Sequence, residues 1–245
     1  MGIEISWRSQ TGTRTDDNRD YGGVGLRGDE ALCVVLDGST KGPDSGALAR
    51  QIASALIDWY VSTDQDITAE ALTARLREIH AALSHEHLRG SASYMIVHVQ
   101  SAHTILVLHA GDCLLGQVEE DGGITWMCQP HTLANIVGEI PVAEIARLAV
   151  RHRLTRSFRP REFMPPDATQ RKIPKDSILV LGTDGFWAEL SAREQDQFLN
   201  GNDVSMTGEG DDRSALCIRI IDGATGSVVR DPQFGAENFY VKTAP

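Results

Sequence analysis

Four aspartates stand where apolar runs of the sequence begin or end. Asp37, Asp112 and Asp184 each follow such a run, and Asp211 precedes one. A single aspartate at a strand end is commonly a turn residue that accepts backbone hydrogen bonds. Four of them indicate more, because the ends of neighbouring strands can converge on one rim. Carboxylates gathered in this way would suit Mg²⁺ or Mn²⁺, which prefer oxygen ligands and retain several waters.

Glycine directly follows one of these aspartates. Gly38 has no side chain, so its backbone carbonyl could approach an ion next to Asp37 closely. Two divalent cations bridged in this way would lower the pKa of a shared water and hold a phosphoryl group. The residues alone therefore indicate a divalent cation site suited to phosphoester hydrolysis, and they leave the substrate open.

Apolar patterning predicts the elements that would carry these groups. The expected strands span residues 4–8, 21–26, 31–36, 94–100, 104–110, 114–119, 124–128, 177–183 and 214–221. Helical spacing predicts one helix from Asp44 or Ser45, a second from Thr68, and short helices within 141–150 and before Phe198. Residues 155–176 contain four prolines and are expected to form an ordered excursion or flap.

The order of these elements predicts the fold class. Helices grouped after runs of strands, with hairpin-like spacing, favour an α+β protein with antiparallel sheets flanked by helices over a doubly wound parallel sheet. The chain has 245 residues, of which 41% are hydrophobic, and shows no internal repeat. We therefore expect one domain that spans residues 1–245.

Composition and charge narrow the function classes. The net charge of −11 disfavours binding to nucleic acid, because an acidic surface repels phosphates. No apolar run is long enough to span a bilayer, and the first residues do not resemble a signal peptide. The four cysteines are scattered without metal-site spacing. These features predict a cytoplasmic protein without a membrane or nucleic-acid partner.

Seven motifs in order resemble the metal-dependent protein phosphatases of the type 2C family. They lie at residues 12–20, 34–38, 90–93, 111–113, 154–156, 179–187 and 211–214. The segment LVLGTDGFW at 179–187 is very close to the family pattern. Each motif is weak alone, and their order and spacing carry the resemblance. It covers about residues 5–221, which makes 222–245 a C-terminal extension of unassigned role.

The resemblance implies a fold and an activity. The fold would be a four-layer αββα sandwich, and the protein would be a divergent, bacterial-like serine/threonine phosphatase. It would hydrolyse phosphoserine or phosphothreonine in protein substrates through a metal-activated water, with two or three Mn²⁺ or Mg²⁺ ions. A serine/threonine kinase would be its functional opposite.

The resemblance also implies a set of metal ligands. Asp37 would bridge two ions, and the Gly38 carbonyl would bind one of them. Asp184 and Asp211 would complete the other metal site.

Further roles are implied around these ligands. Asp20 would order metal-bound waters, and Asp112 could form a weaker third metal site with Asp184. Arg14 would join Asp37 as a catalytic residue by binding the substrate phosphate with its guanidinium. The alternative for Arg14 is a solvated loop residue.

Several positions depart from the family pattern. Arg19 replaces glutamate or glutamine and would oppose the metals unless it points away. Ser39 stands where some members have a histidine general acid. Lys41 could contribute charge to a phosphate or be solvated, and His131 could be functional or structural. Asp212 replaces asparagine and adds charge beside the neighbouring aspartate.

These departures keep two other functions open. One is a catalytically silent relative that regulates or binds a partner, and the other is a hydrolase of small phosphorylated molecules. A basic run comprises Arg151, Arg153, Arg156, Arg159 and Arg161. It could recognise the substrate or be ordinary solvated surface.

Overall fold

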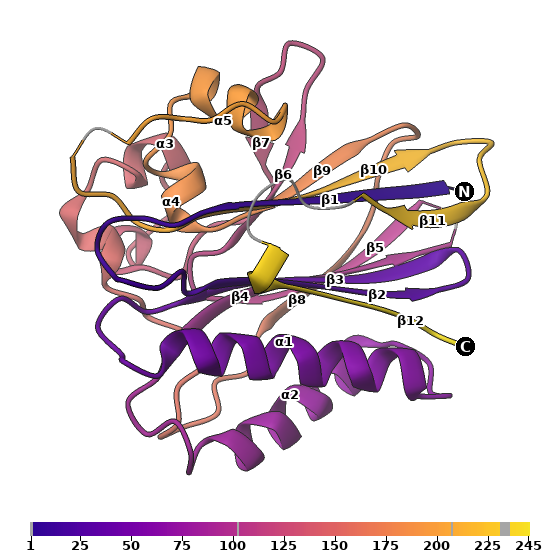
Figure 1. The fold of residues 1–245 in the computed structure, drawn as a ribbon, viewed down its shortest axis with the longest axis horizontal. Helices are drawn as coiled ribbons and strands as arrows, with labels where there is room; N and C mark the ends of the chain where they lie inside the picture. The colour runs from indigo at the N-terminus through magenta and orange to yellow at the C-terminus, as the bar shows by residue number, and fades with distance from the viewer. Residues whose placement is uncertain (1, 102, 207, 231–235) are drawn as a thin grey trace.

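Two six-stranded β-sheets pack face to face at the centre of the protein (Figure 1). The structure is a computed structural model that describes residues 2–101, 103–206, 208–230 and 236–245. The first sheet contains β1 (Gly2–Gln10), β6 (Leu114–Val118), β7 (Ile124–Trp126), β9 (Ile178–Gly182), β10 (Arg213–Ile221) and β11 (Gly226–Val229), in the order β11-β1-β10-β9-β6-β7. The second contains β2 (Asp20–Arg27), β3 (Glu30–Gly38), β4 (Ala92–Gln100), β5 (Thr104–Ala110), β8 (Asp167–Lys172) and β12 (Phe239–Thr243), in the order β12-β2-β3-β4-β5-β8.

Helices cover both outer faces of this sandwich. The long helices α1 (Ser45–Ser62) and α2 (Ala69–Leu83) cover the second sheet, and the short helices α3 (Val142–Ile145), α4 (Asp184–Trp187) and α5 (Ala192–Leu199) lie over the first (Figure 1). Single 3₁₀ turns occur at Leu133–Asn135, Ala149–His152 and Ala236–Asn238. The expected four-layer αββα architecture is confirmed.

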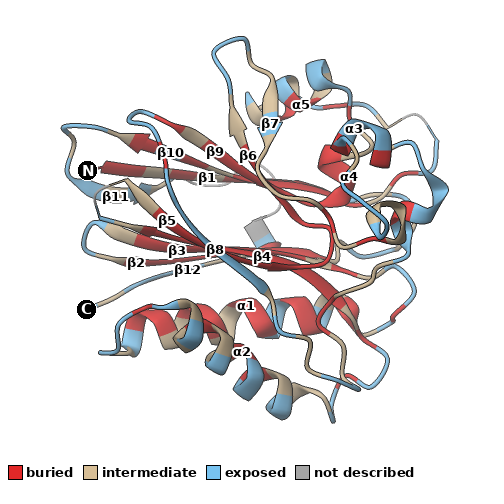
Figure 2. Cartoon of the chain, turned by 180° about the vertical axis from the view of Figure 1, so that it is seen from behind, coloured by how far each residue is buried: buried red, intermediate tan, exposed pale blue. Residues whose placement is uncertain are grey.

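Strand β3 explains why the central strands read as continuous apolar runs. Leu32, Val34 and Leu36 face the helices, whereas Cys33 and Val35 face the other sheet. A strand buried on both faces has no polar alternation. Figure 2 shows the same burial along the central strands of both sheets.

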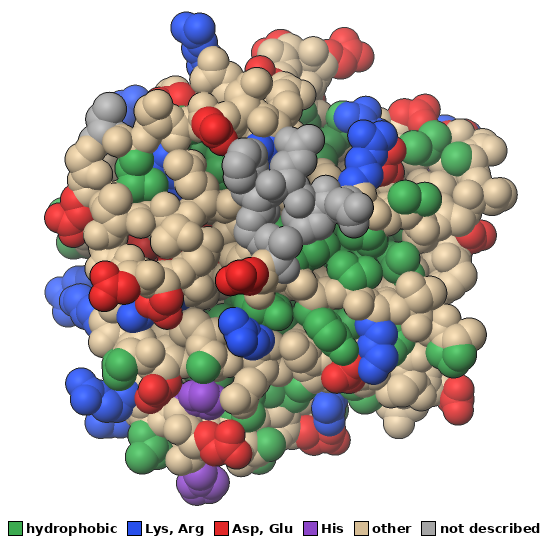
Figure 3. Space-filling model, viewed as in Figure 1, with side chains coloured by type: hydrophobic (Ala, Val, Ile, Leu, Met, Phe, Trp, Pro, Cys, Tyr) green, Lys and Arg blue, Asp and Glu red, His purple; other side chains and the backbone are tan. Residues whose placement is uncertain are grey.

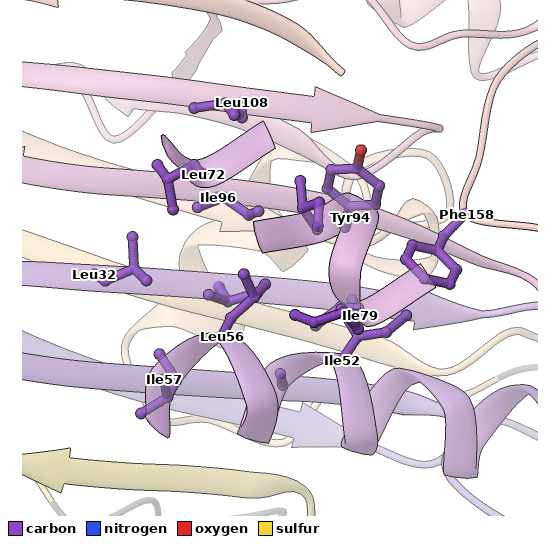
Figure 4. Close-up of a cluster of buried hydrophobic side chains, with 14 of the residues drawn as sticks. Leu32, Ile52, Leu56, Ile57, Leu72, Ile79, Tyr94, Ile96, Leu108 and Phe158 are labelled. Carbon is purple, nitrogen blue, oxygen red and sulfur yellow. The ribbon is translucent and has the colours of Figure 1, made fainter. Parts of the chain in front are cut away.

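The long helices form because their apolar residues recur on one face. Ile52 and Leu56 of α1 and Ile79 of α2 are buried against the second sheet, where Figure 4 shows them gathered around Leu32 and Ile96. The cap expected at position 68 is confirmed, since the Thr68 side chain accepts a hydrogen bond from the backbone N–H of Ala71. Asp44 is the N-terminal cap residue of α1, but its side chain makes no capping hydrogen bond.

Two segments differ from their expected form. Residues 155–176, expected as a flap, include the strand β8, all six of whose residues are exposed. Because β8 is an edge strand that pairs with β5 and buries neither face, its sequence has no apolar alternation. The helix expected within 141–150 is only the single turn α3, followed by a 3₁₀ turn.

The C-terminal segment contributes an edge strand to each sheet. Strand β11 pairs with β1 and β12 pairs with β2, both in parallel. The sheets are therefore mixed, and the expectation of wholly antiparallel sheets was wrong at these two edges. Short, partly polar edge strands carry little periodic signal, so the sequence left this segment without a role.

The described surface is mixed in charge. Acidic and basic side chains are interspersed over the face in Figure 3. Among the helices that the structure describes, none is long and apolar enough to cross a membrane.

Asn238 joins the C-terminal segment to the core. Its side-chain amide donates to the Ser9 hydroxyl and to the Asp20 carbonyl at 2.8 Å each, and it accepts from Trp7 Nε1 at 3.3 Å. Phe239 stacks on the Trp7 ring, with centroids 5.6 Å apart. The segment after residue 235 thus reaches the strand that begins at Asp20.

Replacing Asn238 with alanine should therefore destabilise the protein. Loss of these buried hydrogen bonds should lower the free energy of unfolding by about 1–3 kcal/mol, measured by urea denaturation. Asn202→Ala, at an exposed position, is the matched control and should change it by less than about 0.5 kcal/mol. Equal effects of the two changes would show that Asn238 holds nothing in place.

Candidate functional site

The predicted aspartates meet at the rim of the sandwich that lies opposite the chain termini in Figure 1. Asp37 is the penultimate residue of β3, and Asp112 follows β5 where the chain crosses from the second sheet to the first. Asp184 begins α4 directly after β9, and Asp211 precedes β10. Strands β9 and β10 are neighbours in the first sheet, so their two aspartates belong to the same side of the rim.

A cavity of about 660 Å³ opens at this rim. Arg14, Asp37, Asp112, Asp184 and Asp211 all line it, so the structure brings five of the predicted site residues together. The walls also carry Ser39, Thr40, Lys41, His152, Arg159 and Glu209.

Asp20 and Gly38 lie behind the cavity wall. Asp20 is opposite Asp37 in the pairing of β2 with β3, and it is 1% exposed. Its Oδ2 accepts a hydrogen bond from the Thr183 hydroxyl at 2.9 Å. This bond ties the second sheet to the first one residue before Asp184.

The two Asp-Gly pairs owe their glycines to close backbone packing. A Cβ on Gly38 would lie 2.7 Å from the Ser45 carbonyl oxygen at the start of α1. A Cβ on Gly185 would lie 2.0 Å from the Asp212 carbonyl oxygen. Both glycines therefore allow neighbouring backbone to pack closely at the rim. This packing explains the two glycines independently of the metal-binding role predicted for the Gly38 carbonyl.

Burial and the charges of neighbouring acids disfavour ionisation of Asp37 and Asp112. Burial, followed by the charges of Asp20 and Asp184, raises the pKa of Asp37 well above its usual range. Burial and the nearby Asp184 raise the pKa of Asp112 to about 7, against a hydrogen bond that Ser93 donates at 2.6 Å. No side chain among the described residues donates a hydrogen bond to Asp37.

Two arginines neutralise part of this charge. Arg14 Nη1 lies 2.5 Å from Asp211 Oδ2, and Arg151 Nη1 lies 2.6 Å from Asp184 Oδ2. Glu189 connects them, with its Oε1 3.0 Å from Arg14 Nη2 and 3.6 Å from Arg151 Nη2. Burial and Asp184 still raise the pKa of Asp211 to about 6, although Arg14 opposes this.

Sequence reasoning missed the contributions of Arg151 and Glu189. Arg151 belongs to the basic run for which substrate recognition and solvated surface were both left open, but it is only 6% exposed, because it turns inward to Asp184. Two other arginines of the run have different partners. Arg156 pairs with Asp167, and Arg159 donates to the Ser157 hydroxyl and the Leu154 carbonyl. No sequence motif marked Glu189.

Arg19 points away from the cavity acids. Its Nη1 donates to the carbonyls of Ser39, Thr40 and Gly42 at 2.9–3.1 Å, and its Nε donates to Asp17. The expected repulsion of bound metals is therefore averted. Arg19 instead fixes the loop that follows Asp37 and Gly38.

Asp212 holds the loop that carries Arg14. It is 5% exposed and accepts backbone hydrogen bonds from Gly12 and Arg19, both at 2.7 Å. Burial raises the pKa of Asp212, although these two donors oppose the shift. The extra acid beside Asp211 thus anchors the opening loop and lies outside the cavity.

His131 belongs to a separate cluster with His109 and Asp167. Within the described residues, only these three place three ligand atoms within 4.8 Å of one another. The two rings are stacked at 13°, and imidazole lone pairs lie in the ring plane, so they do not converge on one ion. Moreover, His131 Nδ1 accepts from the Gly111 N–H, which assigns the hydrogen on Nε2 to the bond with Asp167. In this geometry His131 is a structural link beside Asp112.

Solved structures of bacterial phosphatases share this architecture. The serine/threonine phosphatase of S. agalactiae matches with a TM-score of 0.73 at 18% identity, over 89% of this chain and 99% of the other. MsPP, a PPM Ser-Thr phosphatase from Mycobacterium smegmatis solved with cacodylate, matches at 0.67 and 20%, over 89% and 97%. The PstP catalytic domain, solved with two manganese ions, matches at 0.67 and 15%, over 90% and 99%.

The chain has the bacterial serine/threonine phosphatase fold. No protein-family model matches it, and no curated protein sequence does.

The cavity of this phosphatase fold suits divalent cations that remain partly hydrated. Its acids are too far apart for three of their oxygens to lie within 4.8 Å of one another, as far as the described residues go. An ion there would contact few carboxylates directly and keep waters, as Mg²⁺ commonly does. Burial, with the charges of neighbouring acids, raises the pKa of Asp37 and of Asp112, and a bound cation would favour their ionised forms.

The cavity acids should make the metal-free protein sensitive to pH. The pKa of Asp112 is higher in the folded state, so its contribution to stability is full below about pH 4 and is lost as pH rises through about 7. Asp112→Asn should therefore gain stability over the wild type between about pH 5 and pH 8, on the order of 2–4 kcal/mol. Denaturant unfolding in chelator measures this difference.

The variants must be compared at each pH, because His109 changes the stability of the protein with pH in the direction opposite to Asp112. Burial lowers its pKa to about 4, so its contribution is lost as pH falls. Asp66→Asn, at an exposed position, is the control and should follow the wild type at every pH. If Asp112→Asn also followed the wild type, the raised pKa of Asp112 would be refuted.

Proposed function

We propose that this protein is a metal-dependent phosphoprotein phosphatase that hydrolyses phosphoserine or phosphothreonine. The observation that carries the proposal is the convergence of Asp37, Asp112, Asp184 and Asp211 on one cavity. The phosphatase fold supports it, because the similar proteins are serine/threonine phosphatases and one was solved with two manganese ions.

The proposed ligands divide between the two sheets. Asp37 and the Gly38 carbonyl, from the second sheet, would hold one ion, and Asp37 would share a second with Asp184 and Asp211 from the first sheet, in part through the waters that the ion keeps. Two or three bound Mn²⁺ or Mg²⁺ ions would supply positive charge for the phosphoryl group and lower the pKa of a water.

Other cavity residues would orient the reactants. Asp112 lines the cavity, where it could accept hydrogen bonds from ordered water, and it is itself fixed by Ser93. Asp20 is buried opposite Asp37, and its role in ordering metal-bound waters stays a prediction. Arg14 and Lys41 line the same cavity and are the candidates to bind phosphate oxygens. Ser39 also lines the cavity, at the position where some type 2C phosphatases have a histidine that acts as a general acid.

The wider assignments follow from this activity. A phosphoprotein substrate implies a serine/threonine kinase as the opposing enzyme. Four free cysteines favour a reducing, cytoplasmic setting. Pairing of the C-terminal strands with both sheets supports one domain over residues 1–245.

Turnover of p-nitrophenyl phosphate and of a phosphothreonine peptide tests the proposal. Both should be hydrolysed with Mn²⁺ and not with chelator. Asp37→Asn should reduce kcat/KM by more than about a hundredfold, because it removes the ligand that bridges the ions. Asp66→Asn, an exposed change of the same chemistry, should retain full activity.

Other outcomes separate the competing functions. A folded protein that hydrolyses neither compound at any metal concentration would contradict the proposal and favour a catalytically silent relative. Preference for small phosphoesters over the peptide would favour a metabolite phosphatase.

A further inference from the structure

Arg151 is paired with the carboxylate of Asp184, one of the acids that we expect to bind a metal. Its Nη1 lies 2.6 Å from Asp184 Oδ2, at the length of a charge-assisted hydrogen bond. Both side chains are 7% exposed, so water does little to weaken the attraction. His152 Nδ1 is 3.8 Å from the same oxygen. Asp184 Oδ2 therefore faces two basic groups from one 3₁₀ turn.

The pairing belongs to a larger network of opposite charges. Glu189 Oε1 lies within 3.6 Å of both Arg151 and Arg14, and Glu189 Oε2 accepts the backbone N–H of Asp211 at 3.0 Å. Arg14 in turn holds Asp211 Oδ2 at 2.5 Å. The two acids expected to complete one metal site are thus each paired with a guanidinium.

A divalent cation and this guanidinium cannot both be held closely by Asp184 Oδ2. At the low local dielectric of a buried site, two cations on one oxygen repel strongly. Removing the guanidinium without a replacement would leave a buried charge unpaired, which is strongly unfavourable. Exchange of one cation for the other satisfies Asp184 in both states.

We propose that Arg151 is an intramolecular competitor for the cation position at Asp184. Metal binding there displaces the guanidinium, and the wild-type protein fills this position only at higher metal concentration than the position at Asp37. The inference rests on the proposed function, since it concerns the same metal site, and it adds a residue that sets metal affinity.

The displaced side chain retains a partner. Glu189 Oε1 is already 3.6 Å from Arg151 Nη2, so a small movement exchanges one carboxylate for the other. The turn Ala149–His152 that carries Arg151 is short and flanked by the exposed Leu148. Exchange therefore leaves no buried guanidinium without a counter-charge.

The test is a calorimetric titration of Mn²⁺ into wild type, Arg151→Met and Arg153→Met. Arg153 is exposed, has no ion pair among the described residues, and lies two residues along the same segment. The Arg151→Met variant should bind Mn²⁺ at the weaker position at least about tenfold more tightly than the wild type. Arg153→Met should match the wild type.

A thermal melt gives a second readout. Metal-free Arg151→Met should melt below the wild type, and saturating Mn²⁺ should raise its Tm by more than it raises that of the wild type. If Arg151→Met does not fold without metal, Arg151→Lys replaces it and should bind Mn²⁺ more tightly than the wild type, because lysine lacks the planar fork. Adding Asp184→Asn to either variant should abolish the gain.

The outcomes distinguish this inference from the proposed function. Mn²⁺ binding that is equally tight with and without the Arg151 side chain would overturn the competition and leave the phosphatase proposal standing. Absence of Mn²⁺ binding in wild type and variants alike would overturn both, since a released Asp184 would then attract no cation.

Discussion

Burial of neighbouring carboxylates around one cavity is the constraint on which this structure depends. Burial disfavours ionisation of Asp37 and Asp112, and the charges of nearby acids, Asp184 among them, add to the effect. A protein gains nothing in stability from such an arrangement, so the acids are explained by what they bind. Two groups of cations can offset the charge: the arginines that the fold supplies and the divalent ions that we propose.

The sandwich holds the acids in place from behind the cavity. The bond from Thr183 to Asp20 ties the two sheets together at the rim, and Ser93 fixes Asp112 from the neighbouring strand. Arg19 and Asp212 fix the two loops that flank the opening. Arg19 and Asp212, two departures from the type 2C pattern, therefore hold loops at the edge of the cavity that the acids line.

The predictable part of the structure is the part that buries apolar surface on both faces. Strand β3 and its aspartate could be predicted because a run without polar alternation must end where the sheet ends. Strand β8 and the C-terminal edge strands carry no such pattern. Local sequence also does not determine the direction in which a long side chain points. The pairing of Arg151 could not be predicted, because its partners, Asp184 and Glu189, are more than thirty residues away in the chain.

The residue types and their order were enough to predict that Asp37, Asp184 and Asp211 would lie around one cavity, because strand ends on one rim converge. Anomalous X-ray diffraction from crystals soaked in Mn²⁺ tests the cation site directly. We expect an anomalous peak in contact with a carboxylate oxygen of Asp37, with any second peak between Asp37, Asp184 and Asp211. Absence of a peak in this cavity at saturating Mn²⁺, or a peak only at the cluster of His109, His131 and Asp167, would contradict it.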